Sequence, residues 1–388
     1  MTDIAFGSAN EFNAAGTLFV SVAILDATHF VGIYCHNGDS DHGYAVVGVF
    51  SGTTITSYGT PLEFNNAVTY EMFVAALDST HFVIVYQDGG DSNYGKAKVG
   101  LVSGSTISSY GASNTFLSST ATRLSVAALD ATHFALTYRD MTDSNHGKAR
   151  VGLVSGTTIS SYGAANKFLA ETLTYPAIAK LDATHFVVAC SGTSDHGNAI
   201  VGLVSGTTIS SYGSLNEFTT DTTIKISIGA LDATHFVVAY RDNTDSDKGK
   251  AVVGLVSGTT ISSYGAISTF TASNITTTSL AALTSTQFAV AYNDAGDSNH
   301  GKAIIGDVSA VTISSYGAIA EFNPATTTYL SIAALTATIA VIYDDGADSE
   351  HGKAIIGFIS TPFGGKVLGV SSPAKVDGVT SPAKVMGV

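Results

Sequence analysis

Pairs of aspartates recur along the chain in a segment of the form Tyr-x-Asp-x-x-Asp-Ser-x-x-Gly-Lys. The paired members are Asp88, Asp91, Asp140, Asp143, Asp242, Asp245, Asp294, Asp297, Asp345 and Asp348, and in the first unit Asp39 follows His36 instead of a second aspartate. Carboxylates grouped in this way are ligands for Ca²⁺ or acceptors for sugar hydroxyls, so an acidic crown that binds a ligand is one hypothesis. The spacing lacks the dense ligand pattern of a calcium loop, however. The alternative is that Asp and Ser bond to the backbone of an irregular hairpin while Lys neutralises the charge, and on this basis we predict no resident metal or cofactor.

Histidines form two further series. His29, His81, His133, His185 and His235 follow one kind of turn, and His42, His146, His196, His300 and His351 precede the glycine of the acidic segment. The two series fall on opposite faces of the expected fold, so they cannot converge on one metal ion. We predict that they are hydrogen-bonded turn residues.

Catalytic chemistry has little support in the sequence. Propeller glycosidases that bind a carboxylate need several converging arginines, and this chain has only Arg123, Arg139, Arg150 and Arg241. There is no nucleophile elbow, no zinc spacing and no tryptophan to stack on a sugar. The 17 tyrosines recur at strand positions, which indicates packing. We therefore predict a protein that is not an enzyme.

These residues lie within a unit that repeats along the chain. Its landmark, an Asp or Thr after Leu, occurs at Asp26, Asp78, Asp130, Asp182, Asp232, Thr284 and Thr336, with spacings of 50 or 52 residues. In the unit that begins at Ile226, strand-length apolar runs cover 226–231, 236–240, 251–257 and 260–265, separated by turn residues. Four short strands in about 50 residues are typical of one propeller blade. A glycine in the middle of each third strand indicates a bulge or a close approach of the backbone.

The ends of the repeat region predict how the ring closes. The fourth-strand signature, a Tyr-Gly followed by Phe six residues after the Tyr, begins at Tyr58, Tyr110, Tyr162, Tyr212, Tyr264 and Tyr316. The seventh unit stops at Ser360 without it, and a similar segment, Phe6-Gly7 with Phe12, stands near the N-terminus. We therefore predict an all-β fold: residues 1–360 form a seven-bladed β-propeller of four-stranded blades, closed by the N-terminal strand, which removes two sheet edges.

Charge and composition exclude some partners. The formal net charge is −14, which argues against nucleic acid or an anionic membrane surface. No apolar run is long enough to span a bilayer, so we expect no membrane insertion. The first residues lack the features of a secretory signal, and Cys35 and Cys190 occupy non-equivalent positions. We therefore expect synthesis in a cytoplasm and no disulfide.

The fourth unit departs from the others at Lys180, at Cys190 and in its shorter loop. These departures mark either a functional site or random sequence drift.

A second, shorter repeat occupies residues 361–388. Lys-Val-x-Gly-Val recurs every nine residues, and its first and last members are Lys366, Val370, Lys375, Val379, Lys384 and Val388. These units resemble the short repeats at the C-termini of tailed-bacteriophage fibre and appendage proteins. The resemblance implies a virion protein for structure or receptor binding, with a host-surface glycan or protein as its target. It also implies a short β-repeat assembly tail that contacts other virion proteins or forms a homotrimer. A free, lectin-like carbohydrate-binding propeller is the alternative.

Overall fold

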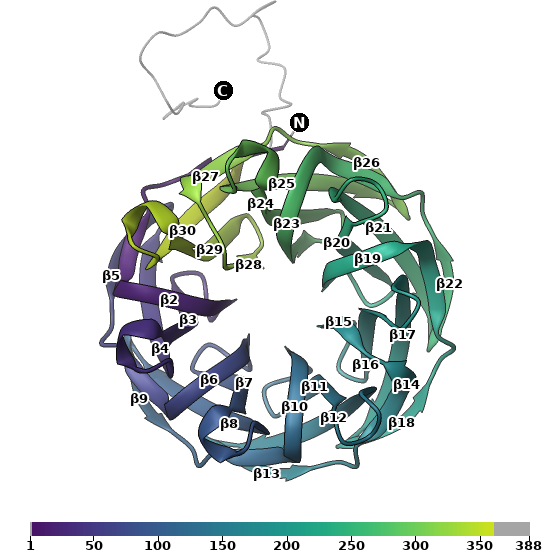
Figure 1. Cartoon of the computed structure of the whole chain (residues 1–388), viewed down its shortest axis with the longest axis horizontal. Helices are drawn as coiled ribbons and strands as arrows, with labels where there is room; N and C mark the ends of the chain where they lie inside the picture. The colour runs from purple at the N-terminus through teal and green to yellow at the C-terminus, as the bar shows by residue number, and fades with distance from the viewer. Residues whose placement is uncertain (1, 361–388) are drawn as a thin grey trace, which may run out of the picture.

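The computed structural model describes residues 2–360, and these form an all-β protein of repeated four-stranded units. The predicted assembly tail, from Lys366 to Val388, lies outside the described residues. Figure 1 shows the units side by side around a central opening. Within residues 2–360, no helix has the length and apolar character needed to cross a bilayer.

Each unit contains four kinds of strand. The long strands are β2 (Asn10–Ile24), β6 (Leu62–Ala76), β10 (Asn114–Ala128), β19 (Asn216–Ala230) and β23 (Ser268–Thr284), with two interrupted versions, β14 (Asn166–Thr172) with β15 (Thr174–Lys180), and β27 (Ala320–Thr326) with β28 (Leu330–Leu335). The second strands are β3 (His29–His36), β7 (His81–Asp88), β11 (His133–Asp140), β16 (His185–Ser191), β20 (His235–Asp242), β24 (Gln287–Asp294) and β29 (Thr338–Asp345).

The remaining elements complete the units. The third strands are β4 (His42–Ser51), β8 (Tyr94–Ser103), β12 (His146–Ser155), β17 (His196–Ser205), β21 (Lys248–Ser257), β25 (His300–Ser309) and β30 (His351–Ser360). The short outer strands are β1 (Asp3–Phe6), β5 (Thr54–Tyr58), β9 (Thr106–Tyr110), β13 (Thr158–Tyr162), β18 (Thr208–Tyr212), β22 (Thr260–Tyr264) and β26 (Thr312–Tyr316). Four acidic loops contain a 3₁₀ turn: η1 (Asn37–Asp39), η2 (Gly89–Asp91), η3 (Ala295–Asp297) and η4 (Gly346–Asp348).

The long strands differ from the sequence prediction. The first part of β23 pairs with β21 of one unit, and its second part pairs with β24 of the next. The outer edge of β21 is therefore shared by β22 and by the start of β23, instead of being covered by one strand over 260–265. The start of β23 is rich in Thr and Ser and is half exposed, so it lacks the apolar alternation that identifies a strand in a sequence.

The hydrophobic core is divided among the faces between units, as predicted. In β20, Phe236 to Tyr240 are all buried, which requires a cover on both faces of the sheet. One core cluster joins Ala189 of β16 to Val238 of β20, so side chains of neighbouring units fill each gap. Cys35 and Cys190 are buried and unpaired, in separate clusters.

The mid-strand glycines allow a close approach, as predicted. A Cβ atom on Gly152 would overlap the ring of Phe134, which crosses the face of the neighbouring strand, and the same holds for Gly254 with Phe236. The register between β12 and β13 also shifts between Leu153 and Val154, which marks a bulge beside the glycine. A residue with a side chain cannot occupy this position without moving the aromatic ring.

The first strands of the chain pair with the last third strand. Asp3 of β1 lies opposite Ser360 of β30, and Asn10 of β2 lies opposite Ala354. A Cβ atom on Gly7 would overlap the carbonyl oxygen of Thr53, as one on Gly59 would overlap that of Ser105 in the next pair of units. The N-terminal segment therefore makes the contacts that the Tyr-Gly segment makes in the other units.

Candidate functional site

The paired aspartates hold their own loops. In the second unit, Asp88 is buried and accepts hydrogen bonds from the Gly90 amide at 3.0 Å and from Lys96 Nζ at 2.7 Å. The same Lys96 Nζ lies 2.7 Å from Asp91, so the ammonium fills the space between the two carboxylates. The same arrangement joins Lys148 to Asp140 and Asp143, Lys250 to Asp242 and Asp245, Lys302 to Asp294 and Asp297, and Lys353 to Asp345 and Asp348. These contacts are the ones that the structural alternative predicted, and ligand binding by the acidic crown stays a prediction.

The first and fourth units depart from this arrangement. In the first, Asp39 accepts a hydrogen bond from the Tyr44 hydroxyl at 2.5 Å. In the fourth, whose loop is shorter, Thr193 donates to the Glu171 carboxylate. In each of these two loops, a different side-chain hydrogen bond takes the place of the lysine–aspartate pairing.

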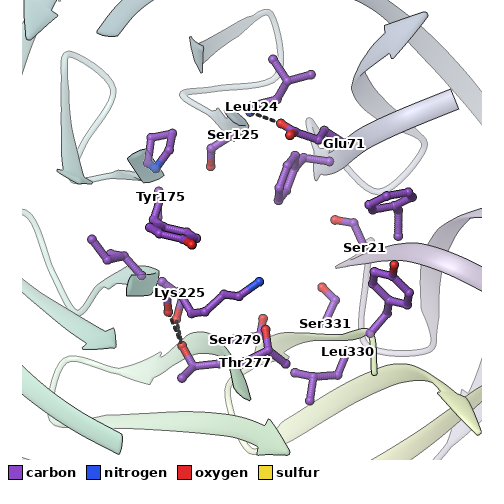
Figure 2. A pocket seen from close by; sticks show the side chains of 18 of the residues that line it. Ser21, Glu71, Leu124, Ser125, Tyr175, Lys225, Thr277, Ser279, Leu330 and Ser331 are labelled. Atoms are coloured by element: carbon purple, nitrogen blue, oxygen red, sulfur yellow. Dashed lines mark hydrogen bonds between the residues drawn. The ribbon is translucent and has the colours of Figure 1, made fainter. Parts of the chain in front are cut away.

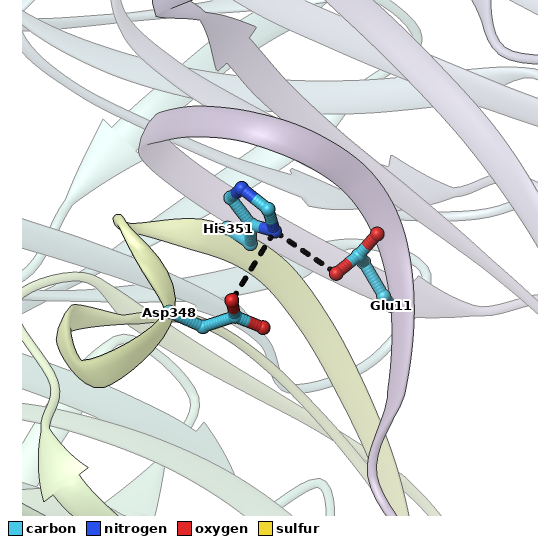
Figure 3. Close-up of side chains that lie close together, drawn as sticks. All are labelled: Glu11, Asp348 and His351. Atoms are coloured by element: carbon cyan, nitrogen blue, oxygen red, sulfur yellow. Dashed lines mark hydrogen bonds and ion pairs between the residues drawn. The ribbon is translucent and has the colours of Figure 1, made fainter.

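Histidines of the acidic-loop series meet carboxylates that the sequence reasoning did not combine with them. His351 Nδ1 lies 2.9 Å from Glu11 and 3.7 Å from Asp348, as Figure 3 shows. Equivalent groups are Asp39, His42 and Glu63, and Asp297, His300 and Glu321. In each group the histidine Nδ1 is hydrogen-bonded to the glutamate, and the aspartate lies 3.6–3.7 Å away, beyond hydrogen-bond distance.

The other histidine series stabilises turns, as predicted. His29 Nδ1 lies 3.0 Å from the Asp26 carboxylate, which also accepts from the Thr28 and His29 amides. Partial burial opposes ionisation of Asp26, but these hydrogen bonds outweigh it and hold the pKa of Asp26 below its ordinary value. The turn is therefore an anchored end of the strand.

A different set of residues lies around the central opening seen in Figure 1. In six of the seven units the long strand contains a register shift at the same place, as between Thr122 and Ser125 of β10. The residue at this bulge has a left-handed backbone in five units, with φ of 46° at Phe19, 38° at Glu71, 56° at Arg123, 43° at Tyr175 and 52° at Lys225. Residues other than glycine adopt such angles at a cost of about 1–3 kcal/mol. Bulges of this kind re-aim side chains and are common beside functional sites.

These bulges surround a cavity of about 710 Å³, within the range of about 300–1,000 Å³ typical of small-molecule sites. Figure 2 shows Glu71, Tyr175, Lys225 and Thr277 reaching it from different strands, and the Lys225 nitrogen points into the opening. We call this cavity the axial pocket. It is also lined by Phe19, Phe73, Arg123, Arg241, Tyr329 and a set of serines and threonines.

Aromatic rings and cations are in contact within the axial pocket. The Arg123 guanidinium lies 4.8 Å from the centre of the Tyr175 ring, and Lys225 Nζ lies 5.8 Å from the same ring. Across the pocket, the rings of Phe19 and Tyr329 are 5.1 Å apart. The pocket thus offers apolar faces and positive charge side by side.

The charge in the axial pocket is unbalanced. Among its lining residues, Glu71 is the one carboxylate, and it accepts hydrogen bonds from the backbone amides of Arg123 and Leu124. Arg241 is paired with Asp247 at 2.7 Å, whereas Nε of Arg123 is buried without a hydrogen-bond partner. The Lys225 side chain is accessible to solvent through the pocket, yet the surrounding protein and the nearby arginines hold the pKa of Lys225 below its ordinary value.

Serine hydroxyls line the pocket below the bulges. Ser21 Oγ accepts from the Val74 amide at 3.2 Å, and Ser125 Oγ accepts from the Ile178 amide at 3.3 Å, so each serine links one unit to the next. Ser331 makes the same contact with the Val22 amide at 3.2 Å. Because the hydroxyl accepts in these bonds, its own proton is free for a further acceptor.

Sequence reasoning missed the axial pocket and dismissed the arginines that contribute to it. Two of the four arginines counted in the sequence, Arg123 and Arg241, line the pocket. Arg139 is not among the lining residues, and its Nε donates a hydrogen bond to Thr122 Oγ1 at 2.9 Å. One signal was present: the residue seven positions before each landmark Asp or Thr differs strongly among otherwise similar units.

Comparisons with known proteins identify the fold. No protein-family model matches the sequence, and no curated protein matches it. Among solved structures, the BP39L lectin from Burkholderia pseudomallei has a TM-score of 0.63 at 6% identity, covering 90% of this chain and 99% of the lectin. A protein of unknown function from Dyadobacter fermentans has a TM-score of 0.56 at 9% identity, with 92% and 99% covered. The WD40 domain of SCAP from fission yeast has a TM-score of 0.50 at 9% identity, with 91% and 98% covered. At these identities the likeness establishes the β-propeller fold alone.

Proposed function

We propose that residues 1–360 are a closed propeller of seven four-stranded blades. Seven core clusters each join one unit to its neighbour, and one of them packs Phe30 of the first unit against Ile342 of the last. The hydrogen bond from the Val22 amide to Ser331 joins the same two units. The contacts between the last unit and the first are thus of the same kind as those between other neighbours, which supports a closed ring.

We further propose that this propeller binds carbohydrate in the axial pocket and carries out no catalysis. The observation that carries the proposal is the combination of aromatic faces at Tyr175 and Tyr329 with serine and threonine hydroxyls around one cavity. Aromatic faces pack against the apolar face of a sugar ring, while hydroxyl groups exchange hydrogen bonds with its hydroxyls. The likeness in fold to a lectin agrees with this function.

A glycan array probed with the full chain tests this function. We expect the chain to bind a defined set of glycans, and Tyr175→Asn to abolish the binding. Asn tolerates the left-handed backbone at this position, so this variant should remain folded. Asp143→Asn, in an acidic loop, is the matched control and should bind as the parent does. Binding that is lost in Asp143→Asn and kept in Tyr175→Asn would move the ligand to the acidic crown.

Attachment to a virion is a second proposal, and it rests on the repeats at 361–388. No solved structure named above is a fibre protein, so the sequence repeat alone supports it. In this proposal the tail joins the propeller to other virion proteins or to two further copies, and the propeller faces a host-surface glycan. Light scattering on the full chain and on a chain that ends at Ser360 tests the tail. We expect a trimer only for the full chain, and monomers in both cases would remove the trimer from the proposal.

A further inference from the structure

We infer that the axial pocket selects acidic saccharides, with a carboxylate of the ligand held between Arg123 and Lys225. This inference rests on the proposed carbohydrate-binding function and specifies its ligand class. It follows from three features of the pocket: two cations around one aromatic ring, a single protein carboxylate, Glu71, to balance them, and the backbone cost of placing them there.

The first feature is the position of the two cations. Arg123 and Lys225 come from different units, yet both approach the Tyr175 ring. Two like charges in a partly desolvated space repel each other, and the lowered pKa of Lys225 reflects both the desolvation and this repulsion. An anion bound between them would be attracted to both cations and would offset their repulsion.

The second feature is the shortage of negative charge around Arg123 and Lys225. Among residues 2–360, the acidic loops neutralise their lysines with two carboxylates each, as with Lys96, Asp88 and Asp91. In the axial pocket the single carboxylate, Glu71, attracts Lys225, but burial and the two arginines outweigh it and keep the pKa of Lys225 lowered. Nε of Arg123 has no acceptor. A guanidinium offers paired donors that match a carboxylate, so the ligand would supply the acceptor that the protein lacks.

The third feature is the bulge itself. Arg123, Tyr175 and Lys225 all occupy left-handed backbone positions, where each non-glycine residue lowers the stability of the fold. A fold that needed only to close its ring could place glycine or asparagine there. Strained positions occupied by two cations and an aromatic ring are explained by the ligand that they bind together.

The test compares 3′-sialyllactose, lactose and citrate as ligands of the full chain by isothermal titration calorimetry. We expect 3′-sialyllactose to bind at least about 10-fold more tightly than lactose, since a hydrogen bond to a charged group contributes about 1.5–3 kcal/mol. The preference should weaken with added salt. Lys225→Gln and Arg123→Gln should each remove the preference for 3′-sialyllactose over lactose. Lys167→Gln, an exposed lysine beside His146, is the matched control and should bind as the parent does.

The outcomes separate the inference from the function on which it rests. Equal affinities for 3′-sialyllactose and lactose would overturn the acidic-saccharide inference and leave carbohydrate binding standing. Binding of citrate alone, abolished by Lys225→Gln, would overturn the saccharide class and assign the pocket to small organic acids. Tight binding of 3′-sialyllactose that survives both glutamine variants would overturn the assignment to the axial pocket. Melting curves of the variants confirm that a lost preference does not reflect unfolding.

Discussion

The outer strands have nearly the same residues in most units, whereas the residues at the axial bulges differ from unit to unit. Five of the outer strands have the same sequence, Thr-Ile-Ser-Ser-Tyr, and the same burial pattern. The bulge position has almost no repetition, and its occupants are Phe19, Glu71, Arg123, Tyr175, Lys225, Thr277 and Tyr329. Positions that serve packing make the same contacts in every unit and therefore need the same side chain. Positions around the axis meet in one place, so together they can form a single asymmetric site.

The largest effect should come from removing the segment that repeats the outer strand at the N-terminus. Deletion of residues 1–13 exposes the outer edge of β30 and breaks its pairing with β1 and β2. Unpaired edges promote aggregation, so we expect the shortened chain to aggregate or to unfold without cooperativity. Calorimetry and size-exclusion chromatography measure both. A shortened chain that melts like the full one would show that the ring does not close through this segment.

Alanine substitutions of two glycines in one hairpin should lower the free energy of unfolding by different amounts. Gly152→Ala would press a methyl group into the Phe134 ring, and we expect a loss of about 3 kcal/mol in the free energy of unfolding. Gly156→Ala meets no atom but has φ of +57°, so its cost should be about 1 kcal/mol. Urea denaturation of both variants measures the difference. Equal losses would contradict the close approach as the reason for the mid-strand glycine.

Substitution of an axial residue should abolish ligand binding without lowering stability, unlike substitution of a packing residue. Lys225→Asn removes a cation that faces Arg123 and relieves the left-handed backbone, since Asn adopts that conformation readily. We expect the free energy of unfolding to be unchanged or to rise by about 0.5–1 kcal/mol, while 3′-sialyllactose binding is lost. Thermal melting and calorimetric titration provide the two values. A variant that is less stable and still binds would make Lys225 a packing residue.

A smaller effect concerns the acid sensitivity of the turns. Five equivalent aspartates, Asp26, Asp78, Asp130, Asp182 and Asp232, have a pKa below the ordinary value. Carboxylates with a lowered folded-state pKa stabilise the fold above the unfolded pKa of about 3.9, and this stability is lost as the pH falls through the folded value.

Asp130→Thr tests this because Thr284 forms the same turn through its hydroxyl, which accepts from the Thr286 amide at 3.2 Å. The variant should lose less stability than the parent between pH 5 and pH 2.5, and denaturant midpoints at several pH values measure it. Identical pH profiles for the two chains would rule out Asp130 as a contributor.

The fold could be predicted from the sequence because every unit repeats the same strands and turns. The 50- or 52-residue period, the six Tyr-Gly segments and the N-terminal segment at Phe6 predicted the pairing of β1 with β30 that the structure contains. The length of strands such as β23 could not be predicted, because its Thr-rich outer part has no apolar alternation. Local pattern therefore identified the buried strands and missed the half-exposed ones.

The axial pocket could not be predicted because its residues are far apart in the chain. Arg123 and Lys225 are separated by about two repeats, and only the curvature of the ring brings both to Tyr175. The acidic loops had the opposite character: their aspartates are close in sequence and attracted a functional hypothesis, whereas the structure pairs them with lysine. In this chain, the position that varies most among the copies lines the axial pocket, whereas the recurring motif forms ion pairs within its own loop.

The number of ligands bound per chain tests the account most directly. A site formed jointly by all units at the axis occurs once, whereas a site formed within or between neighbouring units recurs around the ring. Native mass spectrometry of the full chain, titrated with 3′-sialyllactose, counts the bound ligands. A single axial site should saturate at one ligand per chain. Stepwise filling to several equivalent ligands per chain would contradict it.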